Sequence, residues 1–204
     1  MIRAEIHGIF PVPLYRFKLS RKFTKSELHF VEKMRAKCRP NMGNTTSSNN
    51  YVLNEPSFSI LKKEIDLFIE DYFAKIIFPP KAISPYITQS WLNYTEINEN
   101  HPPHNHPNSY LSGILYIAAD KDHDNVTFGH NNYNQINISP TQKNQFNSFM
   151  LSFPVETGEI MIFPSSLMHS VAVKKGKNSR ISLSFNVFVK GNLGQAQELN
   201  ELKL

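Results

Sequence analysis

The sequence predicts a mainly β protein in which N-terminal helices pack on an antiparallel β-sandwich or jelly roll. The first third carries apolar residues at helical spacing, whereas from Ile87 onward the chain breaks into short alternating or apolar runs separated by Pro, Gly and Asn. Helices followed by many short strands are typical of such a layered fold. With 204 residues and 40% hydrophobic content, the chain suits one domain with a continuous core.

Within this single domain (1–204), residues 1–86 are expected to supply a strand and helices that support the β core. Ile9–Leu19 predicts an edge strand, because its prolines cannot donate to a ladder. A short amphipathic helix then begins at Thr24 as its cap and continues to about Cys38. Its apolar positions are Leu28, Val31 and Met34.

A polar loop is predicted over Arg39–Glu55, which is rich in Asn, Ser, Thr and Gly. A longer amphipathic helix follows over Ser57–Ile77 and ends before two consecutive prolines. Residues 87–190 are expected to form the β core. An Asn- and Gln-rich insertion, Gly129–Ser152, interrupts it and has the length of a binding loop or lid.

Composition limits the expected cellular location and binding partners of the protein. A single cysteine, Cys38, excludes an intrachain disulfide, so we expect a cytoplasmic location. No apolar run approaches the ~18 residues of a membrane span, so no membrane partner is expected. The formal charge is +5, but the basic residues are scattered, and nucleic acid is therefore not indicated as a partner.

Three histidines form the candidate metal site. In a strand, residues two apart point to one face, so His104 and His106 could present two imidazoles to the same ion. His169, which follows a predicted strand and a Pro turn, is the candidate third ligand. Three protein ligands leave open positions, as Fe(II) requires when it takes an organic acid and O₂. The alternative is that the first two are ordinary residues of a Pro/Asn-rich loop.

Arg180 is the candidate anion-binding residue. It opens the alternating strand Arg-Ile-Ser-Leu-Ser-Phe, eleven positions after His169. A guanidinium that projects into an apolar barrel needs an anionic partner, and its fork matches a carboxylate. Ser182 points to the same face and could add a hydroxyl. The alternative is a surface arginine that ends the basic turn Lys174–Arg180.

The region Gln89–Lys190 resembles the Fe(II)/2-oxoglutarate-dependent oxygenase superfamily. Three sequence segments are similar to those of an uncharacterised branch of oxygenases related to prolyl hydroxylases: HNHPNSYLSGILY, GEIMIFPSSLMHSV and SRISLSFNVF. The resemblance implies a double-stranded β-helix, a cupin-like jelly roll. It also implies that His104 and His169 bind the metal, that Arg180 binds the far carboxylate of 2-oxoglutarate, and that Tyr94 assists.

The sequence departs from this family at His106, where the superfamily usually has Asp or Glu. A neutral imidazole leaves the site one unit more positive, which alters the metal's properties. Four other residues are alternative ligands that rank below His104 and His106: Glu96, Asp120, Asp124 and His101. Four aromatic residues suit the pocket wall but are expected to be mostly plain core: Trp91, Tyr116, Phe163 and Phe185.

The activity that the resemblance implies is an Fe(II) dioxygenase, a hydroxylase that couples oxidative decarboxylation of 2-oxoglutarate to substrate hydroxylation. Its cofactors would be Fe(II), 2-oxoglutarate and O₂, with ascorbate as a supporting reductant. Two other functions compete: a cupin-like metal protein or three-His dioxygenase that does not use 2-oxoglutarate, and a β-sandwich interaction module with incidental histidines. The sequence leaves the primary substrate and the oligomeric state open, a homodimer included.

Overall fold

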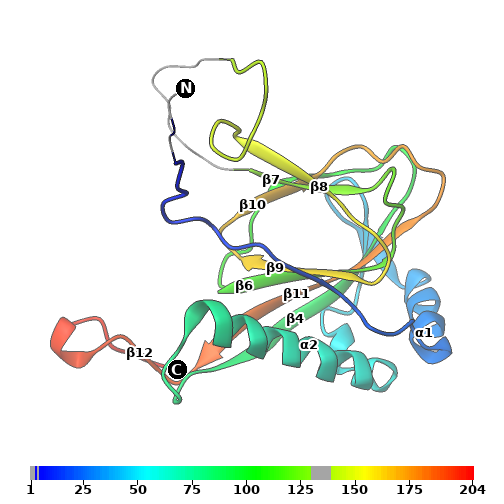
Figure 1. Cartoon of the computed structure of the whole chain (residues 1–204). Helices are drawn as coiled ribbons and strands as arrows, with labels where there is room; N and C mark the ends of the chain where they lie inside the picture. Colours follow the sequence, from blue (N-terminus) through cyan, green and yellow to red (C-terminus); the bar gives the residue numbers. More distant parts are fainter. Residues whose placement is uncertain (1–2, 4, 130–138) are drawn as a thin grey trace.

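The structure is a computed structural model that describes residue 3, residues 5–129 and residues 139–204. Part of the expected insertion Gly129–Ser152 therefore lies outside the described residues. The rest of the chain forms two antiparallel sheets that face each other, with helices on one side (Figure 1). This arrangement is the predicted jelly roll.

The larger sheet has seven strands and the smaller has four. In spatial order, the larger sheet contains β1 (Tyr15–Lys18), β9 (Glu159–Pro164), β6 (Leu111–Ala118), β11 (Arg180–Lys190), β4 (Ser84–Thr95), β3 (Thr45–Ser47) and β2 (Cys38–Pro40). The smaller sheet contains β5 (His101–His104), β10 (Met168–Val171), β7 (Asn125–Gly129) and β8 (Met150–Pro154). A small hairpin of β12 (Asn192–Leu193) and β13 (Leu202–Lys203) lies near the C-terminus.

Both helices lie against the large sheet, on the side away from the small sheet (Figure 1). Helix α1 (Lys25–Arg35) begins with a complete capping box, in which Thr24 and Glu27 satisfy each other's backbone N–H groups. Helix α2 (Ser59–Tyr72) continues into a π-helical segment, Phe73–Ile77. The chain then leaves the helix through a left-handed residue, just before the two prolines that predicted its end.

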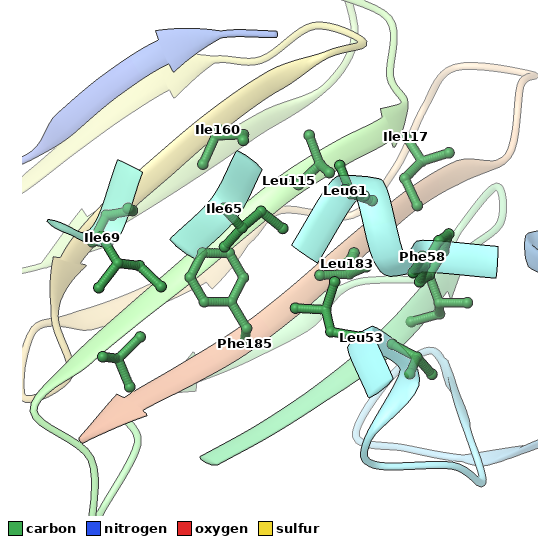
Figure 2. Close-up of a cluster of buried hydrophobic side chains, with 14 of the residues drawn as sticks. Leu53, Phe58, Leu61, Ile65, Ile69, Leu115, Ile117, Ile160, Leu183 and Phe185 are labelled. Carbon is green, nitrogen blue, oxygen red and sulfur yellow. The ribbon is translucent and has the colours of Figure 1, made fainter. Parts of the chain in front are cut away.

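The main core lies between helix α2 and the large sheet (Figure 2). Strand β11 shows how the two faces of this sheet differ. Alternate residues Ile181, Leu183 and Phe185 belong to the helix-facing core. The residues between them face the other sheet, so a polar row lies inside the roll rather than in solvent. That inner row is Arg180, Ser182, Ser184 and Asn186, and all four side chains are buried.

The predicted loop over Arg39–Glu55 is wrong in part, because it contains β2, β3 and a short 3-10 helix, Val52–Asn54. Strand β3 pairs with β4, and the Thr46 hydroxyl donates to the Leu92 carbonyl. These polar side chains are satisfied by the neighbouring backbone, so the strand forms without the apolar alternation that would have revealed it. The edge position predicted for the first strand is confirmed, since β1 borders the large sheet.

No helix among the described residues is long and apolar enough to span a bilayer.

Candidate metal centre

Three imidazoles from two adjacent strands and the following turn converge inside the roll. His104 ends β5 and lies directly opposite His169 of β10 in the antiparallel register, with ring centroids 4.2 Å apart. His106 lies in the turn after β5, where its backbone N–H donates to the Ser165 carbonyl. The candidate ligand atoms of the three residues all lie within 4.8 Å of one another. A single ion could therefore contact all three.

Backbone carbonyls orient two of these rings. Nδ1 of His104 lies 2.9 Å from the Pro102 carbonyl oxygen, and Nδ1 of His169 lies 3.1 Å from that of Leu167. Because a carbonyl only accepts, both Nδ1 atoms carry the proton and both Nε2 atoms keep a free lone pair. This is the usual outer-shell arrangement of a metal-binding histidine. The third ring, of His106, stacks on Trp91 at 5.5 Å.

Burial keeps the three imidazoles neutral. It lowers the pKa of His104, lowers that of His106 to about 4 and lowers that of His169 to about 3, with further contributions from neighbouring histidines in the last two. At neutral pH all three therefore have a lone pair available for a metal. No carboxylate among the described residues joins the cluster, so these ligands would leave the charge of a divalent ion uncompensated.

Arg180 lines the same cavity as the three histidines. Its residue is 4% exposed, and burial holds the pKa of its guanidinium below the ordinary value. Nη2 donates to the Thr95 hydroxyl and Nη1 to the Asn125 carbonyl, at 3.2 and 3.4 Å. Nε has no hydrogen-bond partner among the described residues, and no carboxylate there pairs with this side chain. A buried guanidinium without a counter-ion favours binding of an anion.

The structure brings most of the other predicted site residues to this cavity. Ser182 lies on its wall beside Arg180, and His101 stacks on His104 with centroids 4.1 Å apart. Trp91, Tyr116 and Phe163 also line it. The fourth aromatic candidate, Phe185, lies in the helix-facing core instead.

Tyr94 is not brought to the cavity. It alternates with Asn93 along β4, so its side chain points to the opposite face of the sheet. There its hydroxyl donates to the Val31 carbonyl of helix α1 at 2.6 Å. In this structure Tyr94 therefore joins the sheet to the helix and does not face the histidines.

The alternative carboxylate ligands are occupied elsewhere. Glu96 accepts from the Ser179 hydroxyl at the surface, and Asp120 lies next to His123. Asp124 is buried in an ion pair with Lys174 at 2.8 Å. None of the three carboxylates belongs to the candidate metal group among residues 3, 5–129 and 139–204.

The sequence analysis did not identify two polar residues that line the cavity, Asn93 and Asn44. Asn93 donates to the Ser184 hydroxyl at 3.0 Å, while its buried Oδ1 has no partner among the described residues. Asn44, from the turn between β2 and β3, lines the cavity and donates to Thr95. The alternation Trp91, Asn93, Thr95 was a signal for this face, since these residues lie two apart in a strand.

Comparison with known families agrees with this geometry. A family model described as "Putative 2OG-Fe(II) oxygenase" matches residues 89–186, a stretch that contains the three histidines and Arg180. This central part of the chain is similar to the Fe(II)/2-oxoglutarate-dependent oxygenases. No curated protein matches it in sequence.

Solved structures of this superfamily share the fold at low sequence identity. The epimerase SnoN of nogalamycin biosynthesis, an alpha-ketoglutarate-dependent enzyme, is 10% identical with a TM-score of 0.65, over 88% of this chain and 79% of its own. A prolyl-4-hydroxylase from Pseudomonas putida is 10% identical with a TM-score of 0.56, over 86% and 92%. An oxygenase from Burkholderia pseudomallei is 14% identical with a TM-score of 0.53, over 84% and 83%. Superfamily members with this fold thus include both epimerases and hydroxylases.

Proposed function

We propose that this protein is an Fe(II)- and 2-oxoglutarate-dependent dioxygenase that hydroxylates its substrate. In this proposal His104, His106 and His169 hold the iron, and Arg180 with Ser182 binds the far carboxylate of 2-oxoglutarate. The observation that carries it is the buried, carboxylate-free guanidinium in the same cavity as three neutral imidazoles. A dianion between a divalent metal ion and an arginine would offset two of their three positive charges.

Each residue of the site has a physical task in this reaction. Pro102 and Leu167 hold two metal-binding rings in the Nδ1-protonated tautomer through their carbonyls. Arg180 supplies a fixed fork for a carboxylate, so the acid binds in one orientation. Trp91 and Phe163 present apolar surface to the cavity and limit the entry of water.

Iron bound by these residues would supply the activation of O₂, coupled to decarboxylation of 2-oxoglutarate to succinate. The residues themselves supply binding, orientation and exclusion of solvent. The fold is compatible with either hydroxylation or epimerisation of the substrate, and hydroxylation is proposed because the sequence resembles the prolyl-hydroxylase-related branch.

A second candidate function is a three-His metal protein that does not use 2-oxoglutarate. His106 favours it, because the imidazole stands where the superfamily usually has a carboxylate, and three neutral nitrogens also suit Zn(II) or Cu(II). The two candidates differ in Arg180, which only the first requires for ligand binding.

Calorimetry under anaerobic conditions with Mn(II) distinguishes the two candidate functions. We expect wild-type protein to bind one Mn(II) and then 2-oxoglutarate, and Arg180→Met to weaken 2-oxoglutarate binding by about tenfold or more, because it removes charge-assisted hydrogen bonds. Arg39→Met is the matched control, since Arg39 lies at the surface and contacts Asn50. Unchanged 2-oxoglutarate affinity in Arg180→Met would refute the proposed role. Succinate formation with Fe(II) and ascorbate then tests turnover.

A further inference from the structure

A buried ion pair lies beside the arginine of the site and has no part in the function proposed above. The Lys174 Nζ donates to Asp124 Oδ1 at 2.8 Å, and the two side chains are 0% and 1% exposed. Lys174 also donates to Asn178, and Asp124 also accepts from the Asp120 backbone N–H. A fully buried lysine is rare and needs a specific partner.

One residue of the ion pair is the chain neighbour of a residue that forms a hydrogen bond with Arg180. Asn125, the residue after Asp124, gives its carbonyl to Arg180 Nη1 at 3.4 Å. The negative charge of Asp124 also acts on the guanidinium, since it raises the pKa of Arg180 against the larger effect of burial. Asp124 is therefore a buried carboxylate near a buried arginine, yet the two do not pair, and Asp124 pairs with Lys174 instead.

We propose that Lys174 is a positioning residue for co-substrate binding: by neutralising Asp124, it keeps Arg180 available for the carboxylate of 2-oxoglutarate. The inference rests on the proposed function. Without the lysine, an uncompensated carboxylate would remain near Arg180, where it would attract the guanidinium and repel the incoming dianion. Both effects weaken binding of an anion.

The same ion pair also stabilises the fold. Its effect on folding must therefore be distinguished from the effect of its charges on 2-oxoglutarate binding. The Lys174 backbone is held independently, because its N–H donates to the Glu99 carbonyl and its own carbonyl accepts from Asn98. Removing either charge alone leaves the other buried and unpaired, so both single variants lower the melting temperature. A purely structural role predicts that both also weaken 2-oxoglutarate binding. The electrostatic role predicts weaker 2-oxoglutarate binding only when the lysine charge is removed.

The experiment measures the affinity of Mn(II)-loaded protein for 2-oxoglutarate by anaerobic calorimetry, with Mn(II) affinity and melting temperature measured in parallel. We expect Lys174→Met to weaken 2-oxoglutarate binding by about tenfold, and Asp124→Asn to leave it unchanged or tighter. The Lys174→Met/Asp124→Asn double variant should return to within about twofold of wild type, because neither charge remains. Mn(II) affinity should stay constant.

Lys174→Gln provides a second test if Lys174→Met does not fold, since its amide can still donate to Asp124 while the positive charge is lost. We expect the same direction of change. Lys62→Gln is the matched control, because Lys62 pairs with Asp66 at 2.8 Å on the surface of α2, away from the site. Wild-type affinity in Lys174→Gln, or equal weakening in Asp124→Asn, would overturn the inference. Failure of the wild-type protein to bind 2-oxoglutarate would instead overturn the proposed function.

Discussion

The histidines of the site differ in their roles although four of them share one cavity. His104, His106 and His169 form the group whose ligand atoms converge, whereas His101 stacks on His104 beside that group. The spacing of histidines along the sequence left His101 open as a substitute ligand. The register decides the geometry, because His104 lies opposite His169 while His101 lies opposite Val171.

This difference predicts the outcome of single alanine substitutions. We expect His104→Ala, His106→Ala and His169→Ala each to weaken Mn(II) or Co(II) binding by more than about tenfold, because each removes a ligand nitrogen. His101→Ala is the control and should retain metal affinity. Titration calorimetry at neutral pH measures all four. Loss of binding in His101→Ala with retention in His106→Ala would exchange the two assignments.

Strand alternation explains which site residues the sequence could reveal. Arg180 and Ser182 were predicted on one face of their strand, and both line the cavity. Tyr94 was proposed from a family resemblance alone, and the same alternation places it on the helix side of β4. Asn93, its neighbour, was missed although it lies two positions from Trp91 and therefore on the same face of β4 as that cavity residue.

At the scale of the elements, prediction succeeded where side chains act within a few residues of one another. The capping box of α1 was readable because Thr24 and Glu27 satisfy each other across a single turn. Strands β2 and β3 were not readable. Strand β3 pairs with β4, and its Thr46 hydroxyl donates to a carbonyl 46 positions later, while β2 pairs with β3. No local sequence pattern identifies such a distant partner.

The start of α1 gives a prediction for stability against pH. Burial opposes ionisation of Glu27, but hydrogen bonds from Arg21 and from the Thr24 backbone outweigh it and hold the pKa of Glu27 below its ordinary value. A carboxylate with a lowered folded-state pKa stabilises the protein above its unfolded-state pKa, and this contribution disappears as the pH falls through the folded-state value. We expect Glu27→Gln to be less stable than wild type at pH 7 and the difference to shrink below about pH 4.5.

Urea denaturation of both proteins at several pH values measures that difference. Lys25→Gln is a suitable control, because Lys25 lies in the same helical turn and is exposed. A stability difference between wild type and Glu27→Gln that stays constant down to pH 3 would show that the contribution of Glu27 is packing rather than charge.

At the scale of the whole molecule, the site joins the two sheets. His104 and His169 belong to the small sheet, whereas Arg180 and Ser182 belong to the large sheet. The large sheet is itself fixed to the helices through a shared apolar core (Figure 2). The single domain over residues 1–204 stays a prediction. The composition and run pattern predicted the layers, but the pairing of sheets around the cavity depends on contacts between distant strands.

This arrangement predicts that the effect of 2-oxoglutarate on the melting temperature depends on prior binding of metal. In the proposed function a metal ion would contact the small sheet and its following turn, so Mn(II) alone should raise the melting temperature. 2-Oxoglutarate should raise it further only when metal is present, because it then links the small sheet to Arg180. A ligand at 100 times its Kd adds about 2.7 kcal/mol, which corresponds to a rise of roughly 5 to 10 °C in a protein of this size.

Arg180→Met separates the two increments in the same melting experiment. The metal increment should remain, since the imidazoles are intact. The 2-oxoglutarate increment should fall to about half or less, because a roughly tenfold higher Kd leaves the ligand at only about 10 times its Kd. Succinate, which carries two carboxylates but lacks the keto oxygen, is the matched ligand control and should stabilise the metal-loaded wild type less than 2-oxoglutarate does. A 2-oxoglutarate increment that is unchanged in Arg180→Met, or that appears without metal, would contradict a dicarboxylate bridge between the two sheets.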